Sequence, residues 1–125
     1  MTKYILVVDD SLTIRTSVEY VLKGAGYDVA LAEDGVDAIE KIKSIAGGGD
    51  GVSLIITDVN MPRMDGITFT QNVKKSSFRS TPVLILTTET QAAIKQQGRD
   101  AGAAGWLVKP FQPNQLIDVV KKLVN

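Results

Sequence analysis

The sequence contains no cysteine and no histidine. Without cysteine the chain can form neither a disulfide framework nor a thiolate metal site, and without histidine it lacks the commonest side-chain ligand of transition metals. Carboxylate, carbonyl and hydroxyl oxygens are the metal ligands that remain. Any bound metal is therefore expected to be a hard cation held by oxygen atoms.

An excess of charge of one sign and long apolar runs are missing too. Lys and Arg together number 14, as do Asp and Glu, so there is no net positive field to hold a nucleic acid or an anionic membrane surface. No apolar stretch approaches the roughly 18 residues that would suggest a membrane span. The start of the chain also lacks a small-residue cleavage site. We therefore expect a cytoplasmic protein with no nucleic-acid or membrane partner.

Hydrophobic residues make up 44% of the 125 residues and form short runs. A chain of this size is expected to fold around one core, as a single domain over residues 1–125. Most of the runs are apolar on both faces, which indicates strands that are buried on both sides. They are Ile5–Val8, Val29–Ala32, Leu54–Thr57, Val83–Leu86 and Trp106–Val108.

Segments with helical periodicity alternate with these runs. Apolar residues recur at spacings of three and four around Val18 and Ile42, more weakly around Phe69, and again around Val120 after Pro113. Five alternations of strand and helix predict a parallel sheet between helix layers, with right-handed crossovers. The predicted fold is therefore α/β: a doubly wound, five-stranded parallel sheet of order 2-1-3-4-5 with five helices, as in flavodoxin-like folds.

The glycine-rich stretch 47–51, with sequence GGGDG, could suggest a phosphate cradle. It lacks the GxxxxGK[ST] spacing of such loops and enters a predicted strand instead of leaving one. We therefore interpret it as a plain linker.

Polar residues follow four of the predicted strands at the point where each strand ends. They are Asp9 and Asp10 after the first strand, Asp58 after the third, Thr87 after the fourth and Lys109 after the fifth. The carboxyl ends of parallel strands meet at one edge of a sheet, and ligands bind there where the winding direction reverses. With the order 2-1-3-4-5 that point lies between the first and third strands, so the three aspartates are expected in one pocket.

Three clustered carboxylates repel one another unless a cation lies among them. Mg²⁺ suits such a site because it takes a few carboxylate or carbonyl oxygens and keeps several waters, and the backbone carbonyl of Asn60 is a further candidate ligand. A carboxylate can also attack phosphorus once the charge on the transferring oxygens is neutralised. Lys109 can contribute a cation to that neutralisation, and the Thr87 hydroxyl can donate a hydrogen bond.

Each of these residues also has a simpler interpretation. An aspartate after a strand often caps the next helix, a lysine there is usually a solvated charge, and a threonine usually belongs to a turn or cap. Four strand ends that all carry the required group are harder to attribute to chance. We therefore favour the joint functional interpretation.

From Lys3 to Val124 the chain resembles the receiver domains of two-component response regulators, in particular the single-domain CheY-like chemotaxis proteins. The motifs that carry the resemblance are Val7-Val8-Asp9-Asp10-Ser11, the stretch 57–66 with sequence TDVNMPRMDG, Leu86-Thr87-Thr88 and Val108-Lys109-Pro110-Phe111. The resemblance implies that Asp58 is the phosphorylated residue. The implied Mg²⁺ ligands are Asp9, Asp10, Asp58 and the Asn60 carbonyl, and the implied phosphoryl contacts are Thr87 and Lys109. It also implies a cis peptide bond between Lys109 and Pro110.

In this family, a shift of the threonine toward the phosphoryl group is coupled to an aromatic residue on the fifth strand, which corresponds here to Trp106. Indole is larger than the more usual tyrosine or phenylalanine ring. Trp106 is therefore either a switch residue or an anchor in the core or at the sheet edge. The preceding segment Gln91–Ala101 has mostly alanine as its apolar residues and is interrupted by Gly98, so we expect a weakly anchored helix that suits a moving output face.

The resemblance implies a monomeric signalling protein and no enzyme, apart from self-catalysed phosphorylation and dephosphorylation. The chain ends at Asn125, so we expect no DNA-binding or enzymatic output domain and a signal carried by protein contact. The implied donor is a histidine kinase of CheA type. The implied target is a flagellar motor switch protein or a His-phosphotransfer domain, contacted through the fourth helix, fifth strand and fifth helix.

Three alternatives remain open at this point. A single-domain phosphorelay intermediate or phosphate sink outside chemotaxis would use the same site, with Asn60 and Glu89 flanking the expected path of the attacking water. A phosphatase or phosphotransferase acting on a small molecule would carry DxDx[TV] after the first strand, a spacing that residues 9–13, DDSLT, do not match. A degenerate, purely structural receiver is disfavoured by the intact acids, threonine and lysine.

Overall fold

The computed structural model describes residues 1–88 and 92–124, and in these residues the strands form one parallel sheet. The strands are β1 (Lys3–Val8), β2 (Asp28–Ala32), β3 (Gly51–Asp58), β4 (Val83–Thr87) and β5 (Gly105–Val108). The helices are α1 (Leu12–Gly24), α2 (Gly35–Gly47), α3 (Gly66–Lys74), α4 (Ala92–Ala101) and α5 (Pro113–Leu123). The strand order is β2-β1-β3-β4-β5, which confirms the predicted topology. No helix in this part of the chain is long and apolar enough to cross a membrane.

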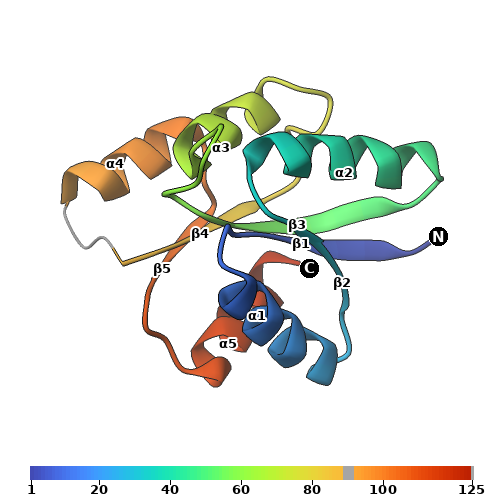
Figure 1. Ribbon diagram of the computed structural model, residues 1–125, viewed down its shortest axis with the longest axis horizontal. Coiled ribbons are helices and arrows are strands. Elements are labelled where there is room, and N and C mark those ends of the chain that lie inside the picture. The colour runs from blue at the N-terminus through green and yellow to red at the C-terminus, as the bar shows by residue number, and fades with distance from the viewer. Residues whose placement is uncertain (89–91, 125) are drawn as a thin grey trace.

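Helices cover both faces of the sheet, with α2, α3 and α4 on one side and α1 and α5 on the other (Figure 1). Successive side chains of a strand point to opposite faces, so β1 contributes to two cores. Leu6 and Val8 lie in the core with α2 and α3, whereas Ile5 and Val7 lie in the core with α1 and α5. Because both faces are apolar, the strands present their charged groups at their ends.

The helices that follow β1, β2 and β3 each begin with a side-chain cap. Ser11 Oγ, Asp34 Oδ1 and Asp65 Oδ1 each accept a hydrogen bond from the backbone N–H three residues later, at 3.3, 2.9 and 2.8 Å. Such caps satisfy N–H groups that have no partner inside the helix. They also fix where each loop at the carboxyl edge of the sheet ends.

The predicted strands are correct in position, but some are longer than their apolar runs. β3 begins at Gly51 instead of Leu54, because its pairing with β1 continues to Lys3 and Tyr4. The glycine-rich stretch is divided between the end of α2 and the start of β3, with Gly49 at a φ of 89° in the connection. It forms no loop that follows a strand, which agrees with the linker interpretation.

The fourth helix differs from its prediction at one residue. α4 runs through Gly98 to Ala101 without a break, so the expected interruption at Gly98 is wrong. Gly98 is buried, and a Cβ at this position would overlap the ring of Trp106. Gln91, the expected start of this helix, and Glu89 lie outside the described residues.

Candidate functional site

The three predicted acids lie together at the carboxyl edge of the sheet. Val8 of β1 pairs with Thr57 of β3, so Asp9 and Asp58 occupy neighbouring strand ends. Carboxylate oxygens of Asp9, Asp10 and Asp58 lie within 4.8 Å of one another. Asp9 is buried, Asp58 is half-buried and Asp10 is exposed, so the cluster has a closed side and an open side.

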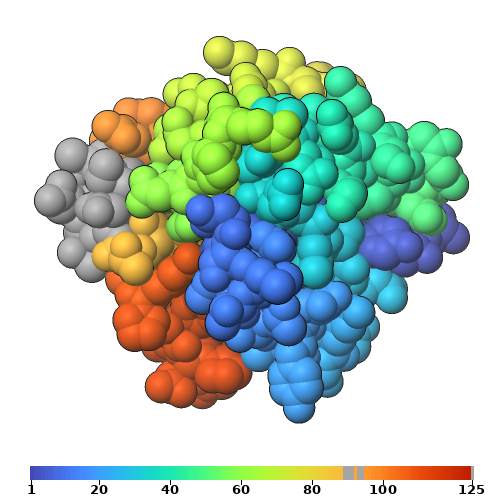
Figure 2. Space-filling view, viewed as in Figure 1, coloured from blue at the N-terminus to red at the C-terminus, as the bar shows by residue number. Residues whose placement is uncertain are grey.

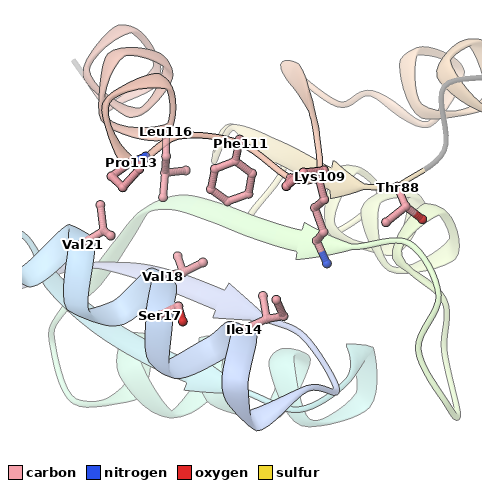
Figure 3. A pocket seen from close by; sticks show the side chains of 10 residues that line it. Ile14, Ser17, Val18, Val21, Thr88, Lys109, Phe111, Pro113 and Leu116 are labelled. Carbon is pink, nitrogen blue, oxygen red and sulfur yellow. The ribbon is translucent and has the colours of Figure 1, made fainter.

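Lys109 reaches this cluster from the end of β5. Its Nζ lies 3.1 Å from Asp9 Oδ2 and 3.5 Å from Asp58 Oδ1. Its side chain is only 15% exposed, which excludes the interpretation as a solvated surface charge. In Figure 3 the side chain extends from the end of β5 toward the ends of the neighbouring strands. One ammonium group therefore faces two of the three carboxylates.

The pKa of Asp58 is nevertheless raised above its usual range. Desolvation by burial is the largest cause, and the Lys109 ammonium, the second largest influence, opposes it. The Asp9 carboxylate raises the pKa further, while the Val59 N–H, which donates to Asp58 Oδ1 at 2.8 Å, lowers it. The cluster thus holds more negative charge than Lys109 compensates. A divalent cation would relieve this excess, and an all-oxygen donor set of carboxylates suits Mg²⁺.

Thr87 lies at the same edge. It is buried at the end of β4, directly after Leu86, the residue that pairs with Asp58. Its carbonyl accepts a hydrogen bond from the Lys109 N–H at 2.7 Å, which places the two residues on adjacent strand ends. The following peptide bond, between Lys109 and Pro110, is cis, as the resemblance implies.

Asn60 belongs to the loop of residues 59–65, which joins β3 to α3. A hydrogen bond from the Gly66 N–H to the Val59 carbonyl, at 2.8 Å, closes the base of this loop. A Cβ on Gly66 would overlap the carbonyl oxygen of Asp58, so this close return of the chain requires glycine. The loop therefore leaves and rejoins the fold beside Asp58. The role of the Asn60 carbonyl as a metal ligand stays a prediction.

Trp106 is the second residue of β5, two residues before the carboxyl end of the strand at Val108. It pairs with Ile85 of β4 and packs, half-buried, against the core beneath α4. Its Nε1 is buried and has no hydrogen-bond partner among the described residues. This position is that of an anchor between β5 and α4, and the coupling of the ring to Thr87 stays a prediction.

Arg15 is a residue near the site that sequence reasoning missed. From the first turn of α1 its Nη1 donates a hydrogen bond to the backbone carbonyl of Asp9 at 2.6 Å. The Asp9 carboxylate itself accepts one from the Ser11 N–H at 2.9 Å. Asp9 is thus held by both its backbone and its side chain. The only available signal was an arginine on the helix that follows the acid pair, because long helical side chains point back toward the N-terminus.

An apolar groove of about 480 Å³ adjoins Lys109 between α1 and α5 (Figure 3). The two helices also adjoin on the molecular surface, as blue and orange-red segments in Figure 2. Lys109 and Thr88 lie at the end of the groove that leads to the acidic cluster. The remaining lining comes from Ile14, Ser17, Val18, Val21, Pro110, Phe111, Pro113 and Leu116.

Comparison with known proteins agrees with this geometry. The family described as response regulator receiver domain matches residues 5–121. The chain is 38% identical to Protein PilG of Pseudomonas aeruginosa over 118 residues, which cover 94% of this chain and 84% of PilG. It spans about half the length of several other curated relatives, 49% to 51%.

Solved structures with the same fold include two informative examples. The chemotaxis protein CheY4 of Vibrio cholerae has a TM-score of 0.87 at 44% identity, covering 98% of each chain. The receiver domain of sensor histidine kinase PA1611 from Pseudomonas aeruginosa, with a magnesium ion coordinated in its active site cleft, has a TM-score of 0.86 at 25% identity, covering 99% of this chain and 98% of that one. Family match, topology and the acidic edge of the sheet agree: the chain belongs to the receiver domains of two-component response regulators.

Proposed function

We propose that this chain is a phosphorylation-operated signalling switch with Asp58 as the phosphoryl acceptor. It takes the phosphoryl group from a histidine kinase in a Mg²⁺-dependent reaction and then signals by binding a target protein, in chemotaxis. It is a single receiver domain of the cytoplasm, and it is no enzyme toward other substrates. The only reactions that it assists are the phosphorylation and dephosphorylation of its own aspartate.

The observation that carries this proposal is the position of the Lys109 ammonium between Asp9 and Asp58, at 3.1 and 3.5 Å. Phosphoryl transfer to an aspartate needs an acceptor carboxylate, a second acid and a cation at one point. Asp58, which is half-buried and has a raised pKa, lies beside both. A structural role for these residues would need no third acid there. Asp10 supplies that acid, and it faces the open side.

The transfer is a nucleophilic substitution at phosphorus. A carboxylate oxygen of Asp58 attacks the phosphorus atom of the donor phosphohistidine, and the bond from phosphorus to the imidazole nitrogen breaks. The nitrogen keeps the electron pair, and the product is an acyl phosphate on Asp58. Hydrolysis reverses the modification: water attacks the same phosphorus, inorganic phosphate leaves, and the carboxylate is restored. The ionised form of Asp58 is the nucleophile, and it needs no general base in the first step because a carboxylate carries no proton to remove.

The residues around Asp58 would bind the metal ion and stabilise the charge of the phosphoryl oxygens. Asp9, Asp10, Asp58 and the backbone carbonyl of Asn60 would hold Mg²⁺, which when bound neutralises charge on the transferring oxygens. Lys109 contributes its ammonium to the phosphoryl oxygens from the side of β5. The Thr87 hydroxyl donates a hydrogen bond to a phosphoryl oxygen from the end of β4.

Chemotaxis is the favoured setting because CheY4, at 44% identity, is a chemotaxis protein. The proposed donor is accordingly a histidine kinase of CheA type. We assign its docking to the groove between α1 and α5, because this groove is apolar and ends at Lys109. The proposed target is a flagellar motor switch protein, bound at the face formed by α4, β5 and α5. A His-phosphotransfer domain as target would instead make the chain a relay intermediate or phosphate sink.

The direct test is transfer from a protein donor. The His-phosphotransfer domain of a CheA-type kinase, phosphorylated and radiolabelled, is mixed with the native chain or with Asp58→Asn, with and without Mg²⁺. We expect the label to move to the native chain only, and only with Mg²⁺. Retention of the label on the donor in the presence of folded native chain would contradict the proposal. Binding of the phosphorylated chain to a motor switch protein or to a second His-phosphotransfer domain then decides between chemotaxis and relay.

A further inference from the structure

An ion pair joins the loop of residues 59–65 to the start of α2. Arg63 Nε donates to Asp34 Oδ2 at 2.8 Å, and Arg63 Nη2 donates to Asp34 Oδ1 at 3.0 Å. Asp34 is only 3% exposed, and its Oδ1 also accepts the Asp37 N–H as the cap of α2. The pair is therefore bidentate, with one partner fixed by a helix. A bidentate pair of this kind fixes the relative geometry of the two side chains as well as stabilising their contact.

Arg63 holds this pair from an unfavourable backbone conformation. Its φ is 63°, the only positive φ of a non-glycine residue in the described part of the chain. A residue with a Cβ rarely adopts the left-handed region without compensating contacts. The bidentate bonds to Asp34 are such contacts, so the shape of the loop depends on them.

Met64 forms a second contact between the loop and the start of α2, next to the Arg63–Asp34 pair. A Cβ on Gly35 would lie 2.9 Å from Met64 Sδ, so Met64 packs directly on the first turn of α2. Asn72 of α3 donates to the same sulfur at 3.4 Å. In Figure 2 the loop and the start of α2 adjoin on the surface, as lime-green and cyan segments. The loop is thus fixed at its base, where Gly66 bonds to Val59, and at its tip, where Arg63 and Met64 contact α2. Asn60 lies in the sequence between these two fixed points.

We propose that the Arg63–Asp34 pair positions the backbone carbonyl of Asn60 for Mg²⁺. Both are positioning residues, since Arg63 binds Asp34 and neither belongs to the acidic cluster. Because the pair orders the loop before the ion binds, binding does not have to supply that order. This inference rests on the proposed function, which places Mg²⁺ at Asp9, Asp10 and Asp58.

Charge alone predicts a different outcome, which makes the proposal testable. If Arg63 and Asp34 acted only through their charges, removal of the cation would strengthen Mg²⁺ binding and removal of the anion would weaken it. If they act as a clamp, removal of either partner weakens binding. Two neutralising variants with opposite charge changes therefore separate the two explanations.

The experiment is calorimetric titration of MgCl₂ into the native chain, Arg63→Gly, Asp34→Asn and the double variant. Glycine tolerates the positive φ at position 63, and asparagine retains the cap of α2, so both variants are chosen to fold. Each single variant is expected to bind Mg²⁺ roughly tenfold more weakly, and the double variant no more weakly than the worse single one. Lys23→Ala, which breaks the exposed pair of Lys23 with Glu19, is the control and should bind like the native chain.

Tighter binding by Arg63→Gly, or unchanged binding by both single variants, would overturn the inference while leaving the proposed function intact. No Mg²⁺ binding by the folded native chain would overturn the proposed function and the inference together. Urea unfolding of every variant establishes that it is folded. If Arg63→Gly does not fold, Arg63→Lys takes its place, since lysine keeps the charge and loses the fork; native-like affinity in that variant would overturn the inference.

Discussion

The ring of Trp106 fills the space beside Gly98 on the inner side of α4. A Cβ built on Gly98 would overlap Trp106 Cζ3 and would lie 2.9 Å from Cε3 and 3.1 Å from Ile85 Cδ1. Gly98 is therefore present because the indole leaves no room for a side chain. The contact joins α4 to β5, two of the elements of the proposed output face.

Gly98→Ala is expected to lower the free energy of unfolding by about 1 kcal/mol. Overpacking of a core costs about 1–3 kcal/mol, and the better helix propensity of alanine, about 1 kcal/mol, offsets only part of this. The double variant Gly98→Ala/Trp106→Phe should lose less than the sum of the two single variants, because the smaller ring makes room. Urea unfolding followed by circular dichroism measures all three.

Gly47→Ala is the matched control for that series. Gly47 ends α2, and a Cβ there would meet no atom within 4 Å. Its substitution should be neutral or stabilising. A native-like Gly98→Ala variant would mean that α4 shifts freely over Trp106, which would contradict the close contact described above.

Asp58→Asn is expected to stabilise the metal-free protein at neutral pH, on the order of 1 kcal/mol. Burial and the Asp9 carboxylate raise the pKa of Asp58, so its ionised form is disfavoured in the folded state. At a pH between the pKa of Asp58 in the folded state and its lower pKa in the unfolded state, the folded state binds more protons than the unfolded state does. The native chain therefore gains stability as the pH falls through this range. The advantage of the variant should therefore shrink as the pH falls from the folded pKa to the unfolded value.

Urea unfolding in the presence of EDTA, repeated from neutral to acidic pH, measures this advantage. Asp118→Asn, which removes an exposed carboxylate on α5, is the control. A variant that is less stable than the native chain at neutral pH would show that the Lys109 pair outweighs burial.

Lys109→Gln is expected to change Mg²⁺ binding and phosphorylation in opposite directions. Loss of a cation beside Asp9 and Asp58 should strengthen Mg²⁺ binding by on the order of 1 kcal/mol, or about fivefold. Loss of the same cation from the transferring phosphoryl group should slow phosphorylation by a small donor on the order of a hundredfold. Calorimetry and intact mass measure the two effects, with Lys122→Gln on the surface of α5 as control. Weaker binding together with slower phosphorylation would indicate a general loss of structure instead.

Ser17→Glu tests the docking groove. Ser17 is exposed and lines the groove on α1, so a glutamate there should fold normally and place a charge in an apolar surface. We expect transfer from a phosphohistidine domain to fall at least about tenfold, the effect of roughly 1.4 kcal/mol of lost docking. Phosphorylation by acetyl phosphate should be unchanged. Ser44→Glu, at an exposed position on α2 in the opposite layer, is the control; equal effects of both variants would show that the groove is not the docking site.

The fold is predictable from the sequence because its signals are local. Strands buried on both faces appear as short apolar runs, and the polar residue that follows each run can be read directly from the sequence. Asp9, Asp58 and Lys109 can therefore be placed at one edge of the sheet from the sequence alone, and the structure brings them together. The extent of β3 is less accessible, because Gly51 joins the sheet through backbone pairing that its side chain does not reveal.

The contacts that tie the site to the rest of the fold cannot be predicted in the same way. The pair of Arg63 with Asp34 depends on a positive φ and on where α2 lies, neither of which leaves a pattern in the sequence. The prediction at Gly98 was wrong for the same reason. In isolation a glycine weakens a helix, and only the position of Trp106 shows why it is required.

The central claim, that Asp58 is a Mg²⁺-dependent phosphoryl acceptor, is tested most directly by intact mass after incubation with acetyl phosphate. The native chain and Asp58→Asn are compared with and without Mg²⁺, and Trp106 fluorescence is followed in parallel. We expect a single phosphoryl adduct on the native chain that requires Mg²⁺ and is missing from the variant. An adduct of equal yield on Asp58→Asn, or none on folded native chain with Mg²⁺ bound, would contradict the claim.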